Sequence, residues 1–256
     1  VIMVNDSKKI TIEPYQTTMN TINDSSYRSK VLNNKINQMT RNKLDPLKRL
    51  DYFSFYALNS PFIYHYNGTS LYSSIFNGQT LKYYDQTMQI NMPVDKNSTY
   101  RYLGNRANLM ALWNVQDRLR HPNDLNIPYG FKKKDLIKDG KDQWIHSKNT
   151  ISYPSAHITH KVYNSNDLKS PLDREQAMLQ GVVFDNNKKS ANTKFSPNKN
   201  LLNDAQLQLK DSQWEKKSQL NVDKNNGGVQ LTLPQSLTKK YKDMYIEMDV
   251  ELLTPD

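Results

Sequence analysis

The residues with the clearest chemical potential lie in one polar and aromatic stretch, Tyr64 to Gly78, which reads YHYNGTSLYSSIFNG. Aromatic rings stack on the apolar faces of sugar rings, while Asn, Ser and Thr exchange hydrogen bonds with sugar hydroxyls. The same residue types also build packed turns, with the aromatic rings buried and Gly, Asn and Ser at the bends. The stretch is therefore either a carbohydrate-binding surface or a turn-rich packing element, and residue types alone favour the second.

A pair of histidines, His157 and His160 in SAHITHK, has the spacing of metal ligands on one face of a helix. The flanking sequences ISYPS and KVYN are strand-like, and residues three apart on a strand point to opposite faces. Neither an HExxH motif nor a cysteine accompanies the pair. The sequence therefore predicts surface or hydrogen-bonded histidines, with no metal and no other cofactor.

Motifs of hydrolytic enzymes are missing from the sequence. It contains no GxSxG motif and no Gly-rich phosphate loop, and no His or acid stands near Ser73 and Ser74 in sequence. Acids between Asp117 and Asp142 could supply the carboxylate pair of a glycosidase, but scattered acids are typical of any protein surface. We therefore expect no catalytic residue in this chain; turnover of a glycan by the chain alone would indicate a secreted hydrolase instead.

The net positive charge of the chain limits the kinds of partner that it is expected to bind. The 256 residues carry a formal net charge of +10 at pH 7, and 36% of them are hydrophobic, which indicates a folded and well-solvated protein. The lysine runs are broken by Asp and Asn and lack the Gly-aromatic pattern of an RNA-binding strand, so we expect no nucleic-acid partner. The positive field suits an anionic lipid surface or a phosphate-rich wall polymer.

Sequence patterns predict the elements that must position these residues. Helices are expected at Val31 to Met39, at Gly78 to Gln89 and within NRANLMALWNV, and a turn at Asn126 to Lys134. The clearest helix start is SPLDREQAMLQG, where Ser170 fits the N-cap, Pro171 the first helical position and Gly181 the end. Residues 62 to 66 are expected to be extended, with alternate aromatic rings on one side.

The composition changes towards the C-terminus, where residues 186 to 203 are rich in Asn, Lys, Ser and Pro and form the best linker candidate. Beyond it, AQLQLKDSQWEKKSQLNVD, GGVQLTLPQ and DMYIEMDVELL alternate apolar and polar residues, as β-strands do. The predicted class is α+β: a mixed helix and strand domain at residues 1–185, the linker, and a β-rich segment at 204–256 that begins a β-sandwich.

Several short motifs in order resemble the extracytoplasmic portion of the bacterial YfhO family of membrane proteins. They are YNGTSLYSSIFNG, YRYLGNRANLMALWNV, IPYGF and SPLDREQAMLQGVVFD, and the resemblance covers about residues 62–185, with weaker similarity in the later strands. The sequence departs from the family pattern at NVQDRL, residues 114–119, and at YPSAHITHKVYN, residues 153–164.

The resemblance implies a fragment of a polytopic protein similar to the GT-C class of glycosyltransferases, which use lipid-linked sugars outside the cytoplasmic membrane of Gram-positive bacteria. It also implies a role in decorating wall polymers such as lipoteichoic acid. The chain begins VIMVNDSKK without an initiator Met and contains no apolar run of membrane-spanning length. We therefore expect an excised outer domain that serves recognition or scaffolding beside the membrane portion of its own parent chain.

Two functional hypotheses follow. In the first, the domain presents an anionic wall polymer or a lipid-linked sugar to a catalytic centre in that membrane portion. In the second, the chain is a free-standing secreted protein that binds glycan or wall polymer. The residues expected to contact glycan or phosphate are Tyr64, Tyr66, Ser73, Ser74, Asn77, Arg101, Arg106 and Tyr129.

Overall fold

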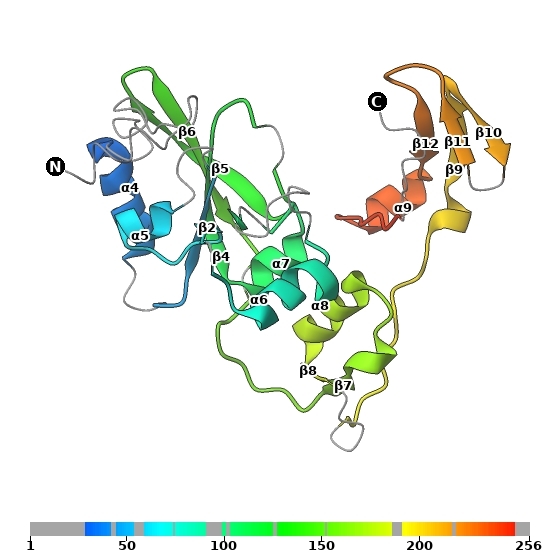
Figure 1. The fold of residues 1–256 in the computed structure, drawn as a ribbon, viewed down its shortest axis with the longest axis horizontal. Coiled ribbons are helices and arrows are strands. Elements are labelled where there is room, and N and C mark those ends of the chain that lie inside the picture. Colours follow the sequence, from blue (N-terminus) through cyan, green and yellow to red (C-terminus); the bar gives the residue numbers. More distant parts are fainter. Residues whose placement is uncertain are drawn as a thin grey trace, which may run out of the picture. The chain divides into compact units, whose positions relative to one another are not determined.

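The chain folds as a mixture of short helices and small sheets in two compact units, Val1–Lys194 and Phe195–Asp256 (Figure 1). This confirms the predicted α+β class, and the division falls within the predicted linker of residues 186–203. The computed structural model describes residues 29–41, 45–53, 59–73, 75–90, 99–100, 103–124, 127–151, 153–185, 191–216 and 219–248.

The main sheet of the first unit has four strands in the order β1, β4, β6, β5. β1 (Arg49–Tyr52) runs parallel to β4 (Val115–Arg120) although the two strands are far apart in the chain. β6 (Asp142–Asn149) is antiparallel both to β4 and to β5 (Phe131–Asp139). β5 and β6 form a hairpin that turns at Gly140, whose φ of 59° favours glycine. β5 is therefore an edge strand of this sheet.

One face of the sheet packs against α4 (Lys30–Thr40), which lies beside β1 and β5. The hydroxyl oxygen of Ser29 caps the helix by accepting from the backbone N–H of Leu32 at 2.9 Å. The buried side chains of α4 follow helical spacing, which confirms the helix predicted at Val31 to Met39. The core formed at this contact consists of Leu32, Ile36, Met39, Leu50, Tyr52, Tyr64, Tyr66, Leu119, Ile137 and Trp144.

The opposite face of β1 and β4 buries a group of charged side chains. The carboxylate of Asp51 accepts from Arg120 Nη2 at 2.5 Å, from Arg118 Nε at 3.4 Å and from Thr69 Oγ1 at 2.9 Å. Asp124 lies 3.2 Å from Arg120 Nε. Burial and then repulsion by Arg120 lower the pKa of Arg118 to about 10, so the Arg118 guanidinium stays charged at neutral pH. Each buried charge thus has an opposite partner.

A second core forms around the predicted helix at Gly78 to Gln89. The structure confirms this helix, as α6 (Gly78–Lys82) followed by the π-helical segment η1 (Tyr83–Thr87). The ring of Tyr84 meets the ring of Trp113 edge-on at 5.8 Å, beside α7 (Ala107–Leu112). The buried members of this core are Tyr84, Met88, Ile90, Leu103, Leu109, Met110, Val115 and Phe131.

The predicted helix start at Ser170 is confirmed by α8 (Pro171–Gln180), which packs against α7. The hydroxyl of Ser170 accepts from the backbone N–H of Asp173 at 3.2 Å, and Gly181 follows the last turn. Around α8 lie η2 (Ser165–Asp167) and the parallel pair β7 (Val162–Asn164) and β8 (Val182–Phe184).

The expectation of an extended chain at residues 62–66 is wrong. The segment begins with a short helix, α5 (Ser60–Tyr64), because Pro61 occupies its first turn, where the fixed φ of proline suits a helix. The turn expected at Asn126 to Lys134 is also too long, since β5 already begins at Phe131. A small antiparallel pair, β2 (Leu71–Tyr72) and β3 (Thr99–Tyr100), follows α5.

The second unit begins with η3 (Leu202–Asp204) and contains the predicted strands as two antiparallel pairs. β9 (Gln206–Lys210) pairs with β12 (Gly228–Thr232), and β10 (Ser212–Lys216) pairs with β11 (Gln219–Val222). A short helix, α9 (Gln235–Lys240), follows. The strand predicted from DMYIEMDVELL does not form over residues 243–248, and residues 249–253 of that motif lie outside the described part. The β-sandwich stays a prediction.

Candidate functional site

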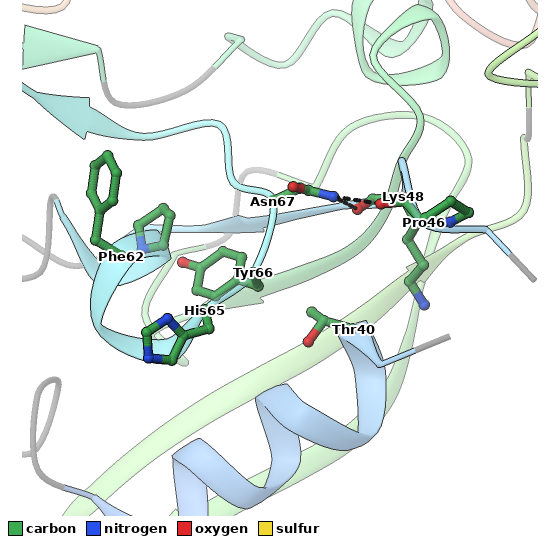
Figure 2. Close-up of a pocket in the computed structure, with 8 residues that line it drawn as sticks. Thr40, Pro46, Lys48, Phe62, His65, Tyr66 and Asn67 are labelled. Carbon is green, nitrogen blue, oxygen red and sulfur yellow. Dashed lines mark hydrogen bonds between the residues drawn. The ribbon is translucent and has the colours of Figure 1, made fainter. Parts of the chain in front are cut away.

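The described part of the chain has an open pocket of about 460 Å³ in the first unit (Figure 2). Three segments form it: the end of α4, the loop that leads into β1, and α5 with the residues that follow it. The lining residues are Thr40, Pro46, Lys48, Pro61, Phe62, His65, Tyr66 and Asn67.

The geometry of α5 decides which aromatic rings reach the pocket surface. Phe62 is 66% exposed, whereas Tyr64 and Tyr66 are 4% and 8% exposed and belong to the core below. His65 ends the helix in the left-handed conformation, with φ 54°. Phe62 and His65 both line the pocket, and the ring of Phe62 points away from the other lining side chains (Figure 2).

Tyr66 forms the floor between the pocket and the core. Its hydroxyl lies 2.7 Å from the hydroxyl of Ser60, which is fully buried. Burial raises the pKa of Tyr66 above its ordinary value, so the phenol stays neutral across the physiological range. Tyr66 can therefore offer a ring edge and a hydrogen bond but no charge.

Asn67 and Gly68 hold the wall of the pocket against the sheet. The side-chain amide of Asn67 donates to the carbonyl of Pro46 at 2.7 Å (Figure 2). Its backbone carbonyl accepts from the N–H of Leu50 at 2.9 Å. A Cβ on Gly68 would lie 2.4 Å from Pro61 Cγ, so only glycine allows this close approach. The loop that carries His65 is thereby fixed to β1.

The ammonium group of Lys48 joins the pocket to a buried chain of charges. Lys48 Nζ lies 2.6 Å from Asp117 Oδ2, and Asp117 Oδ1 lies 2.7 Å from His146 Nε2. His146 Nδ1 lies 3.1 Å from Asp135, whose carboxylate also binds Lys35 at 2.8 Å. These five side chains extend from the pocket, beneath α4, to the edge strand β5. Each ring nitrogen of His146 thus faces a carboxylate.

This arrangement sets the pKa values of the two acids. Burial alone would raise the pKa of Asp117, but hydrogen bonds from His146 and Lys48 outweigh it and lower the pKa. Lys35 and then His146 lower the pKa of Asp135 to about 2. Both acids are therefore ionised at neutral pH and serve as partners of Lys48 and Lys35.

The pocket has the chemistry of a binding site. It presents the exposed ring of Phe62 for stacking, the imidazole of His65, and the hydroxyl of Thr40, which donates to Ile36 O at 2.8 Å and keeps its lone pairs for a ligand. None of its lining residues is an acid or a cysteine. Within the described residues no group of three or more His, Cys, Asp or Glu side chains could hold a metal ion.

The residues expected to contact glycan or phosphate lie in different parts of the first unit where the structure describes them. Among those within the described ranges, only Tyr66 lines the pocket. Ser73 closes a local turn with Ile75, and Asn77 caps α6 by accepting from Gln79 N at 2.8 Å. Tyr129 is 45% exposed in the turn before β5. Ser74 and Arg101 lie outside the described residues.

Arg106, expected to bind phosphate or sugar, contacts protein groups. Its Nε and Nη2 both bind the carboxylate of Glu175, a fully buried residue of α8. Its Nη1 donates to Met88 O at 2.5 Å, at the end of η1. Burial raises the pKa of Glu175, and Arg106 acts in the opposite direction. Arg106 therefore joins α8 to η1 through a buried ion pair.

Sequence analysis missed three pocket residues, Lys48, His65 and Thr40, and it did not single out Phe62 as a binding residue. The one signal in the sequence was the aromatic and amide stretch, which does supply one wall of the pocket. The two histidines considered as metal ligands lie elsewhere. His157 Nε2 lies 3.0 Å from the hydroxyl of Tyr153, as expected of a hydrogen-bonded histidine.

Comparison with known proteins identifies the family. The family model described as "Bacterial membrane protein YfhO" matches residues 1–256. The chain belongs to the YfhO family. The uncharacterized protein YfhO of Bacillus subtilis (strain 168) is 29% identical over 229 residues, which cover 88% of this chain. No solved structure matches.

The YfhO relative is much longer than this chain. The matched region is 26% of its length, so the chain spans about a quarter of the curated relative. Within the described residues no helix has the length and apolar character needed to cross a membrane.

Proposed function

We propose that this YfhO-family chain is the extracytoplasmic domain of a membrane-embedded enzyme that glycosylates cell-envelope polymers, such as lipoteichoic acid, from a lipid-linked sugar. In this proposal the domain binds the polymer or the sugar, and the catalytic residues belong to the membrane portion of the parent protein. The localisation is the outer face of the cell membrane, and nucleic acid is not a partner.

The observation that carries the proposal is the pocket of Phe62, His65 and Thr40. The lining includes an exposed phenylalanine, an imidazole and a hydroxyl, which are the groups that stack on sugars and hydrogen-bond to them. The pocket has no acid among its lining residues, which favours recognition over hydrolysis. Its walls are fixed by Asn67 and Gly68, so little ordering is needed on binding.

The test is a binding measurement on the chain with lipoteichoic acid, by isothermal titration calorimetry. Phe62→Ala removes the exposed ring and is expected to weaken binding about tenfold, with thermal stability unchanged because the ring is solvent-exposed. Phe184→Ala is the matched control, since Phe184 is 42% exposed on β8, which contributes nothing to the pocket lining. Equal affinities of the two variants would exclude the pocket as the glycan site.

A second measurement tests the membrane part of the proposal. The reading frame on both sides of this chain in the parent gene is translated and scored for hydropathy. Several apolar stretches of about 20 residues would support a membrane enzyme and direct the search for catalytic acids there. A single signal peptide upstream and a stop codon downstream would favour the free-standing secreted binding protein.

A further inference from the structure

The β5–β6 hairpin concentrates positive charge on the edge of the main sheet. Residues 131–149 contain six lysines against three aspartates. Four of the lysines belong to the edge strand β5 itself, and all four are exposed. We call these four residues the β5 lysines: Lys132, Lys133, Lys134 and Lys138.

The acids of β5 have partners of their own on the α4 side of the sheet. Asp135 binds Lys35 and His146, and Asp139 accepts from the hydroxyl of Ser29 at 2.5 Å, so both point to the α4 side of the sheet. No described residue forms an ion pair with any of the β5 lysines. The remaining acid of the hairpin, Asp142, is the first residue of β6 and pairs with Asp139. The register therefore places Lys133 and Lys138 on the face opposite these acids, whereas Lys132 shares the face of Asp135 and Lys134 lies at the bulge; all four lysines are exposed.

The register of the hairpin places an apolar residue among these lysines. Lys133, Leu136 and Lys138 pair with Ser147, Ile145 and Gln143, which alternate along β6 and so share one face. That face is opposite the one on which Asp135 and Ile137 lie towards α4. Leu136 is 42% exposed there. Lysines around an exposed aliphatic side chain are the chemistry of a surface that rests on an anionic bilayer.

We propose that the β5–β6 hairpin docks this domain onto the anionic lipid surface of the membrane that holds its parent protein. Membership of a membrane-protein family keeps the domain close to a bilayer, so even weak attraction acts at high effective concentration. Each exposed lysine near an anionic lipid surface adds to the attraction, which decays over about 8 Å at physiological salt. The proposal is independent of the glycan pocket.

The lysines on the edge strand β5 also have a purely structural explanation. Lysines on an edge strand also prevent edge-to-edge aggregation of sheets. If the β5 lysines dock the domain onto a membrane, replacing them should weaken lipid binding. If they protect the sheet edge, replacing them should increase self-association.

The test is co-sedimentation of the chain with vesicles of pure phosphatidylcholine and vesicles of equimolar phosphatidylcholine and phosphatidylglycerol. We expect binding to the second only, lost at high salt. Replacing the four β5 lysines by Gln should lower the partition coefficient at least about tenfold, whereas replacing them by Arg should preserve it. The matched control removes four exposed lysines elsewhere by the same Lys→Gln change: Lys169, Lys210, Lys239 and Lys242.

Three results would overturn the proposal. The first is an equal loss of binding in the β5 variant and the control variant, which would assign the attraction to net charge alone. The second is unchanged lipid binding in a β5 variant that aggregates, which would support edge protection. The third is binding to soluble inorganic polyphosphate without binding to either vesicle, which would identify a polymer as the partner. Circular dichroism of each variant verifies that it is folded.

Discussion

Lys48 Nζ and Asp117 Oδ2 lie 2.6 Å apart, with their side chains 8% and 3% exposed. The pair connects a pocket residue to the second strand of the main sheet, and His146 extends the connection beneath α4. A buried ion pair contributes little net stability, but removing one partner leaves an unpaired charge that is costly to bury. The pair therefore serves mainly to fix the position of Lys48 in the pocket, and it adds little to stability.

We expect Asp117→Asn to lower the free energy of unfolding by about 3 kcal/mol, because Lys48 and His146 would lose their shared acceptor. Urea denaturation measures the change. Asp204→Asn is the control, since it breaks an exposed pair with Lys199 and should leave the stability nearly unchanged. Equal effects of the two substitutions would contradict the buried charge chain.

Arg106→Ala should destabilise the chain by about 3 kcal/mol, because it removes the ion-pair partner of the fully buried carboxylate of Glu175. Combining Arg106→Met with Glu175→Leu should recover much of the loss, since no charge then remains buried. Thermal unfolding of the single and double variants tests this. A stable Arg106→Ala protein with weakened glycan binding would instead support the ligand role expected from the sequence.

Asp135 is expected to contribute stability that depends on acid pH. Its pKa falls from 3.8 to about 2 in the folded chain because of Lys35 and then His146. A lowered folded pKa means that the contribution is complete above the unfolded pKa and is lost as the pH falls from about 4 to about 2. The difference in stability between wild type and Asp135→Asn should shrink over this interval. A difference that stays constant would show that the ion pair is absent.

Gly68→Ala should be destabilising by about 2 kcal/mol, because the added Cβ would overlap Pro61 Cγ and push α5 away from the sheet. The control is Gly78→Ala in the first turn of α6, where nothing lies within 4 Å of the new Cβ and a small stabilisation is expected. Chemical denaturation compares the two. The same substitution should also weaken any ligand of the pocket, since it displaces Phe62 and His65.

Local sequence signals predicted the elements that are formed by local interactions. A helix was predicted at Val31 to Met39, where α4 forms, and Ser170 with Pro171 marked the start of α8. These signals involve residues within a turn or two of each other, so a short stretch of sequence contains the interactions that determine each helix. The α5 helix was missed because alternate aromatic rings resemble a strand, and the effect of Pro61 decided the outcome.

The site could be predicted only in part because its members come from separate segments. Lys48 and Asp117, or Arg106 and Glu175, are 69 residues apart, and the sequence does not reveal such pairings. The sequence did identify the wall that contains Tyr66 but not the ring that reaches solvent. The exposure of each aromatic ring depends on which side of α5 faces the core. That side is set by packing against α4, which comes earlier in the chain.

The parallel pairing of β1 with β4 has a consequence for how the chain folds. Parallel strands cannot be joined by a tight turn, and here α5, α6 and α7 all lie between the two in the chain. The β5–β6 hairpin can form early from neighbouring residues. β1 can pair with β4 only after the long segment between them has folded back. The parallel pair β1–β4 is therefore expected to form after the hairpin, and its formation would distinguish fully folded molecules from partly folded ones.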